Sequence, residues 1–91
     1  MKAKIDFVCK PANEASEYEL ESIFLIVDLP FVPSVGMMLK LTDEGDYIQV
    51  IDVMFDLTPG GDGLTVGLKE PDEDFQLRSW PEMKAQGWQL G

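Results

Sequence analysis

Carboxylates are the only side chains that this sequence supplies densely enough to do chemistry. The chain has 17 Asp and Glu residues against 7 Lys and Arg residues, a formal net charge of −10, and no histidine. The absence of histidine removes the commonest general base, the commonest ligand of transition metals, and every nucleophile that a histidine would activate. We therefore expect no hydrolase, transferase or redox activity and no cofactor.

The acidic residues gather in three clusters that a hard cation would find attractive. None of the clusters has the alternate ligand spacing of a calcium-binding loop, so we interpret all three as solvated surface and expect no metal site. Asp52 and Asp56 lie about 13 Å apart if they share a strand, which is too far for the carboxylate pair of a glycosidase. The clusters are Glu14, Glu17, Glu19 and Glu21; Asp43, Glu44 and Asp46; and Glu70, Asp72, Glu73 and Asp74.

Two further candidates for chemistry have structural explanations. Cys9 falls on the apolar side of an alternating segment, which favours a buried thiol over a reactive one, and a single cysteine agrees with a reducing compartment. The glycine string at 60–63 lacks the lysine of a phosphate-binding loop and is typical of a hairpin turn. No apolar run is long enough for a membrane helix and no secretory signal precedes the first strand, so we expect a cytoplasmic protein.

Alternation of apolar and polar residues predicts five strands, at 2–9, 20–29, 37–42, 47–57 and 64–69. The run Leu29–Leu39 contains two prolines and Gly36, which predicts a fixed corner between the second and third strands. The second strand has apolar residues on both sides, so we expect both of its faces to be buried. In the fourth strand we expect a bulge near Val50 or Ile51 and a buried face of Ile51, Val53, Phe55 and Leu57.

The five strands and their turns predict a mostly-β single domain over 1–91, built as a small closed SH3-like barrel over residues 1–69. Residues 70–91 are expected to form an acidic linker and a docking tail. Within this tail, Phe75–Leu77 has the composition of a short strand, and Ser79, Glu82 and Gly87 have the spacing of helix caps, which predicts a short helix at 80–86. Trp80, Met83 and Trp88 are expected to dock the tail on the barrel.

The two-proline run Leu29–Leu39 and the strand Tyr47–Val53 that follows it also carry a resemblance. This stretch of the chain, residues 20–57, resembles small uncharacterised bacterial β-barrel proteins of the kind carried on phages and gene cassettes. The resemblance implies a barrel fold. It implies no activity and no functional residue.

Three functions stay open at this point, and the first is preferred: a non-enzymatic, acidic protein-interaction module or accessory protein. The second is a small-molecule binder with an apolar pocket formed by Trp80, Trp88 and the loop 31–38 under the tail. The third is an acidic mimic of nucleic acid that binds a basic protein groove. The surface expected to contact a partner consists of Phe24, Ile26, Phe31, Pro33, Met38, Trp80 and Trp88.

Two expectations about partners follow from charge and hydrophobicity. We expect no direct binding of nucleic acid. Phosphate contacts by Lys and Arg supply most of the affinity for nucleic acid, and this chain has 7 such residues against 17 acidic ones. Phe24 and Ile26 point away from the side of the second strand that fills the core, so we expect a homodimer that covers them if the tail does not.

Overall fold

The computed structural model describes residues 1–10, 20–43, 45–70 and 78–91. The predicted strand at 75–77 and much of the three acidic clusters lie outside these ranges. The described residues contain six strands and one helix: β1 (Lys2–Cys9), β2 (Glu21–Asp28), β3 (Met38–Leu39), β4 (Ile48–Asp56), β5 (Gly63–Leu68), α1 (Trp80–Ala85) and β6 (Gln89–Leu90).

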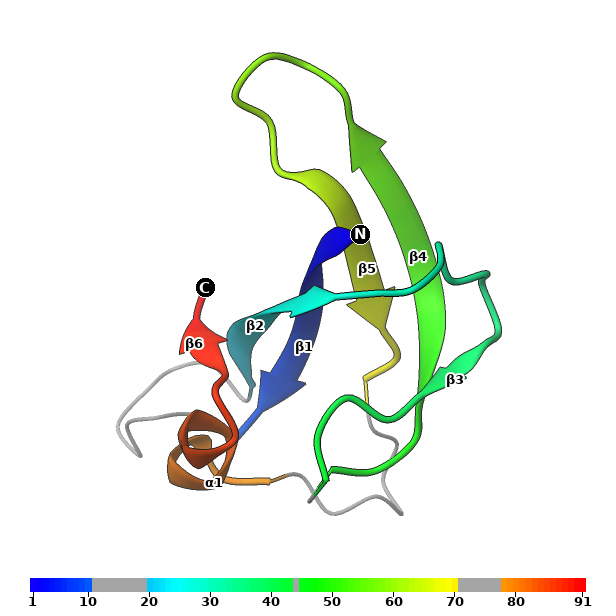
Figure 1. Ribbon diagram of the computed structural model, residues 1–91. Coiled ribbons are helices and arrows are strands. Elements are labelled where there is room, and N and C mark those ends of the chain that lie inside the picture. Colours follow the sequence, from blue (N-terminus) through cyan, green and yellow to red (C-terminus); the bar gives the residue numbers. More distant parts are fainter. Residues whose placement is uncertain (11–19, 44, 71–77) are drawn as a thin grey trace.

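All six strands belong to one curled sheet in the order β3-β4-β5-β1-β2-β6 (Figure 1). The neighbouring strands are antiparallel except for β1 and β5, which run parallel. The prediction of a mostly-β domain with a short C-terminal helix is confirmed. The predicted number of strands is wrong, because β6 adds a sixth strand that is only two residues long and has no alternating pattern to reveal it.

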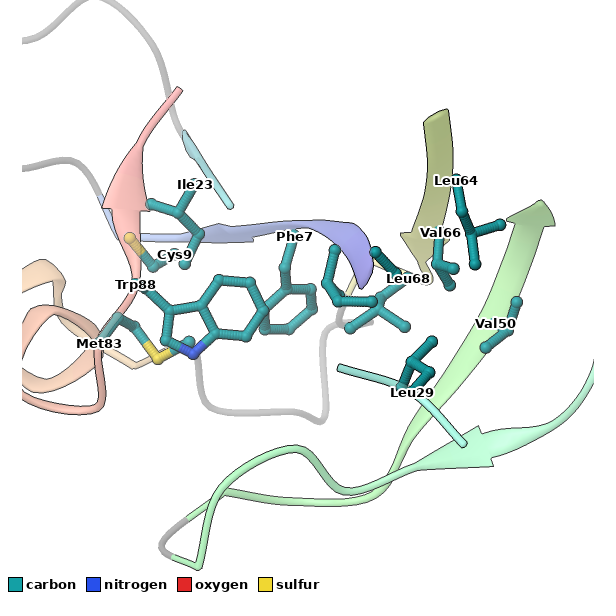
Figure 2. Packing of buried hydrophobic residues seen from close by; sticks show 12 residues of the cluster. Phe7, Cys9, Ile23, Leu29, Val50, Leu64, Val66, Leu68, Met83 and Trp88 are labelled. Carbon is teal, nitrogen blue, oxygen red and sulfur yellow. The ribbon is translucent and has the colours of Figure 1, made fainter. Parts of the chain in front are cut away.

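The hydrophobic core lies on the concave side of the sheet (Figure 2). In β1 every second residue is buried, which confirms the predicted alternation and the predicted burial of Cys9. Figure 2 shows Met83 and Trp88 at one end of the core, Phe7 beside Trp88 nearer the middle, and Val50, Leu64 and Val66 at the other end. The buried residues are Ala3, Ile5, Phe7, Cys9, Ile23, Leu29, Val50, Leu64, Val66, Leu68, Met83 and Trp88.

The two-proline corner fastens the connection between β2 and β3 to the beginning of β4. Gly36 has a φ of 94°, which residues with a side chain rarely adopt. Its N–H donates to the Val50 carbonyl, and the Val50 N–H donates to the Met37 carbonyl, both at 2.8 Å. The register of β4 against β5 shifts between Val50 and Asp52, so the predicted bulge is confirmed at this point.

The C-terminal segment docks on the core, as predicted. The Ser79 hydroxyl accepts a hydrogen bond from the Glu82 N–H at the start of α1, and Gly87 has a φ of 99° just after its end. Trp88 is buried with its ring 5.9 Å from that of Phe7, and β6 then pairs with β2. In the described part of the chain, no helix has the length and hydrophobicity to cross a membrane.

Two expectations about the strands are wrong. The outer side of β2 is not fully covered, since Ile26 is exposed. The predicted buried face of β4 is also not formed, because Ile51, Phe55 and Leu57 are exposed. The second error has a plain cause: the covering chain meets β4 only up to Val50, and beyond that point Val53 alone among the four residues predicted for this face is packed against the core.

Candidate functional site

A projecting hairpin is formed by β4 and β5. Figure 1 shows this hairpin extending well beyond the other strands. Ile51, Met54, Phe55 and Leu57 keep 43%, 56%, 51% and 88% of their surface exposed. Large apolar side chains left exposed on a strand at the edge of a sheet are typical of an element that contacts another molecule. We call these four residues the arm surface.

The pairing with β5 determines on which side of the sheet each β4 residue lies. Val53 and Phe55 are opposite Val66 and Leu64, whose side chains are buried in the core, so they lie on the concave side. The residues between and around them lie on the outer side of the sheet. These outer residues are Asp52, Met54 and Asp56, which are opposite Gly67, Thr65 and Gly63.

The edge of β4 that faces away from β5 is free along the hairpin. β3 pairs with β4 only at Ile48 and Gln49, and the corner loop adds the two hydrogen bonds of Val50. From Ile51 to Asp56, none of the residues that the structure describes forms a strand on this side. An unpaired strand edge presents a row of backbone N–H and C=O groups that an extended chain can bind.

The tip of the hairpin is held by the carboxylate of Asp56. This carboxylate accepts hydrogen bonds from the hydroxyl and from the N–H of Thr58, the latter at 3.0 Å. The two hydrogen bonds lower the pKa of Asp56 below its ordinary value. A β-carbon on Gly61 would collide with the Asp56 carboxyl group, so a glycine is required for this close approach.

Exposed apolar residues of the corner loop continue beside the base of the hairpin. Phe31, Val35 and Met38 are exposed, and the backbone of the loop is hydrogen-bonded to Val50, directly before Ile51 in β4. Pro33, between them, is buried. The loop therefore extends the apolar character of the arm surface along the same edge of the sheet.

The outer face of the sheet carries a second, smaller apolar patch. Ile26 is 42% exposed and Phe24 is half-buried, with the Lys4 ammonium group 5.1 Å from the centre of its ring. The cation thus covers part of the aromatic face. A shallow cleft of ≈ 700 Å³ on this face has Gly67 among its lining residues, together with Phe24 and Met54.

The space between α1 and the β3–β4 connection is small. A cavity of ≈ 30 Å³ is lined by Phe7, Met83 and Trp88 among others, a volume that suits a water molecule. Metabolite pockets measure about 300–1,000 Å³. A hydrogen bond of 2.6 Å from the Thr42 hydroxyl to the Gln86 side-chain oxygen closes one side. The geometry therefore gives the predicted pocket under the tail no support.

The seven residues predicted to contact a partner do not form one surface. Phe24 and Ile26 lie on the outer face, Phe31 and Met38 lie near the base of the hairpin, and Trp80 is half-buried against the core. Pro33 and Trp88 are buried, so their assignment to a contact surface is wrong: each packs inward where the chain turns onto the core.

Sequence analysis missed the arm surface because alternation indicates on which side of a strand a residue lies. It does not indicate whether other elements cover that side. Alternation correctly places Val53 and Phe55 on one side of β4, but whether that side is buried depends on how far the opposite layer reaches. The available signal is the string of Asp52, Asp56 and Asp62 beside these apolar residues, since charges on a strand are typical of an exposed edge.

The charged groups of the described residues form no cation site. No group of three or more Cys, Asp or Glu side chains lies close enough together there to hold a metal ion. Asp52 and Asp56 are both exposed. Burial, and to a lesser extent the charge of Glu21, raises the pKa of the Cys9 thiol above its ordinary value, which keeps it in the unreactive neutral form.

Searches against protein-family models, curated proteins and solved structures returned no match, so the geometry of the arm surface and of its free edge is the basis for a functional assignment.

Proposed function

We propose that the protein is a non-enzymatic interaction module that binds a protein partner through the arm surface. The observation that carries this proposal is the exposure of Ile51, Met54, Phe55 and Leu57 on a hairpin that projects from the core. Removing their large apolar side chains from water would favour binding, by about 25 cal/mol for each Å² of apolar surface that is buried. For the fold, an SH3-like barrel stays a prediction.

The absence of histidine from the sequence supports the non-enzymatic part of the proposal. The small-molecule alternative, a pocket under the C-terminal tail, has less support, because the cavity beside α1 measures only ≈ 30 Å³. The acidic mimic rests on the net charge of −10 alone. It differs from the preferred function in its sensitivity to salt, because screening weakens charge attraction between exposed groups but leaves apolar contacts intact.

Capture of partners on the immobilised protein, at low and at high salt, tests the proposal. The double variant Met54→Ser/Phe55→Ser should lose the proteins that the unmodified chain retains at both salt concentrations. The matched control is Ile26→Ser/Leu90→Ser, which removes two exposed apolar residues outside the hairpin and the neighbouring corner loop and should retain most of them. Capture that is equal for both variants, or that disappears completely at high salt, would contradict the proposal.

A further inference from the structure

We propose that the arm surface binds its partner by strand addition: an extended segment with alternating apolar and basic residues pairs with the free edge of β4. This inference rests on the proposed function and adds the chemistry of the partner. Three features carry it, namely the free backbone edge, the two-sided pattern of side chains along that edge, and the distribution of charge.

The free edge has the length that strand addition needs. β4 continues from Ile51 to Asp56 beyond the last hydrogen bonds of the corner loop at Val50, while β5 pairs with it on the other side up to Gly63. This hairpin supplies a paired strand whose second edge is available among the described residues. Main-chain hydrogen bonds to such an edge provide affinity for an extended peptide, and neighbouring side chains provide specificity.

The side chains along the edge predict the sequence of the added segment. An added strand would lie about 4.8 Å from β4, with its side chains alternating between the two sides of the sheet. On the concave side they would lie beside Val53 and Phe55, so apolar residues fit there. On the outer side they would lie beside Asp52 and Asp56, where lysine or arginine fits, because opposite charges on paired strands attract.

The charge pattern favours a basic partner over a second copy of this chain. β4 contains Asp52 and Asp56 and no basic residue. If two copies paired antiparallel about Met54, then Asp52 of each copy would be opposite Asp56 of the other. Like charges in directly opposite positions destabilise a sheet. The net charge of −10 on each molecule adds repulsion between copies and attraction for a basic segment.

A synthetic peptide of about eight residues, in which valine and lysine alternate, is the direct probe. Added to the isotope-labelled full chain, it should shift the backbone amide resonances of Ile51–Asp56 in NMR spectra and leave those of β1 and β2 in place. The same peptide with glutamate in place of lysine should bind at least about tenfold more weakly, because every charge on its basic side is reversed.

Two controls separate strand addition from general charge attraction. A version of the valine–lysine peptide with N-methyl groups on alternate residues keeps its charge and loses the backbone donors of one edge, so its affinity should fall by about tenfold or more. In the protein, Asp52→Lys should lower the affinity for the unmethylated peptide by about fivefold. Asp43→Lys makes the same change of charge in the β3–β4 connection and should leave that affinity within about twofold.

The proposal is overturned if the N-methylated peptide binds as well as the unmethylated one, if the glutamate peptide binds equally, or if the shifted resonances lie outside the hairpin. It is also overturned if the Ile51–Asp56 resonances shift with protein concentration alone, which would indicate pairing with a second copy. Failure of the peptide while capture still depends on Met54 and Phe55 would reject strand addition and leave the proposed function intact. Failure of both would reject the proposed function.

Discussion

Cys9 shows how burial determines the chemistry of a single residue. The thiol lies in the core with no exposed surface, and its pKa is raised mainly by burial and also by the charge of Glu21. A raised pKa means that the folded state holds the thiol proton more tightly than the unfolded state does. The contribution of the buried, neutral thiol to the free energy of unfolding is therefore fully present below the pKa of the unfolded chain. It is lost as the pH rises from that value through the higher pKa of the folded state.

We expect native Cys9 to react with Ellman's reagent far more slowly than in urea-unfolded protein. We also expect the free energy of unfolding, measured with urea, to fall between pH 7 and about pH 10. Cys9→Ala removes the thiol and should show a smaller fall over the same range. Equal reaction rates in native and unfolded protein would show that the thiol is accessible and that this account is wrong.

At the scale of elements, the tip of the β4–β5 hairpin depends on the contact between Asp56 and Thr58. Gly61→Ala places a β-carbon where the Asp56 carboxyl group lies, so the carboxyl group must rotate away and lose both hydrogen bonds. The pKa of Asp56 should then rise toward its ordinary value, because those hydrogen bonds are what lower it. Titration of the carboxyl carbon by NMR measures this change.

Two substitutions of Thr58 serve as controls for the tip. Thr58→Val removes the hydroxyl donor and should also raise the pKa of Asp56, whereas Thr58→Ser keeps the donor and should leave the pKa low. Since the folded-state pKa is the lower one, the stabilisation from this contact is present above the unfolded-state pKa and is lost as the pH falls through the folded-state value. An unchanged pKa in Gly61→Ala and Thr58→Val would contradict the assigned cause.

The docking of the tail should be visible in stability. Trp88 is buried against Phe7, and replacing it by alanine removes a large side chain from the core. We expect Trp88→Ala to lower the free energy of unfolding by about 3–5 kcal/mol. Leu90→Ala, at an exposed position in the neighbouring β6, should change it by less than about 0.5 kcal/mol. Urea denaturation compares the two, and similar values would show that the tail is not part of the cooperative fold.

The elements were predictable from the sequence where the evidence is local. Alternation identified β1, β2, β4 and β5, proline and glycine identified the corner, and Ser79 with Glu82 identified the start of α1. Coverage was not predictable, because it depends on the reach of other elements. Phe55 has the pattern of a core residue and is exposed, whereas Pro33 lies in a loop and is buried. The parallel pairing of β1 with β5 was not predictable either, because the choice of a pairing partner leaves no periodic signal in the sequence. The strand β6 has two residues, which is too short for an alternating pattern.

At the scale of the whole molecule, the position of the tail bears on self-association. The tail packs on the concave side through Met83 and Trp88, so it does not cover the patch of Phe24 and Ile26 on the outer face. A homodimer that buries this patch therefore stays a prediction. Repulsion between molecules with a net charge of −10 opposes it, and salt screens that repulsion.

Sedimentation at tens of micromolar protein tests the dimer. We expect the dimer fraction to increase from low to high salt, and Ile26→Ser to reduce it at both. Phe31→Ser, an exposed apolar residue away from the outer face, serves as the control and should sediment like the unmodified protein. A monomer at both salt concentrations would show that Lys4 and its neighbours cover the patch well enough without a second copy.

The strand order also has a consequence for the way the chain folds. β4 and β5 are joined by a short turn and can pair early, whereas β1 must meet β5 across most of the chain, as in the pairing of Ala3 with Leu64. Pairings of such high sequence separation slow folding, so we expect single-domain refolding in milliseconds to seconds, which stopped-flow tryptophan fluorescence can measure; refolding in microseconds would contradict it. Until β1 arrives, the early hairpin has two open edges. During that interval Asp52 and Asp56 would act as gatekeepers that keep nascent hairpins of neighbouring chains from stacking into aggregates.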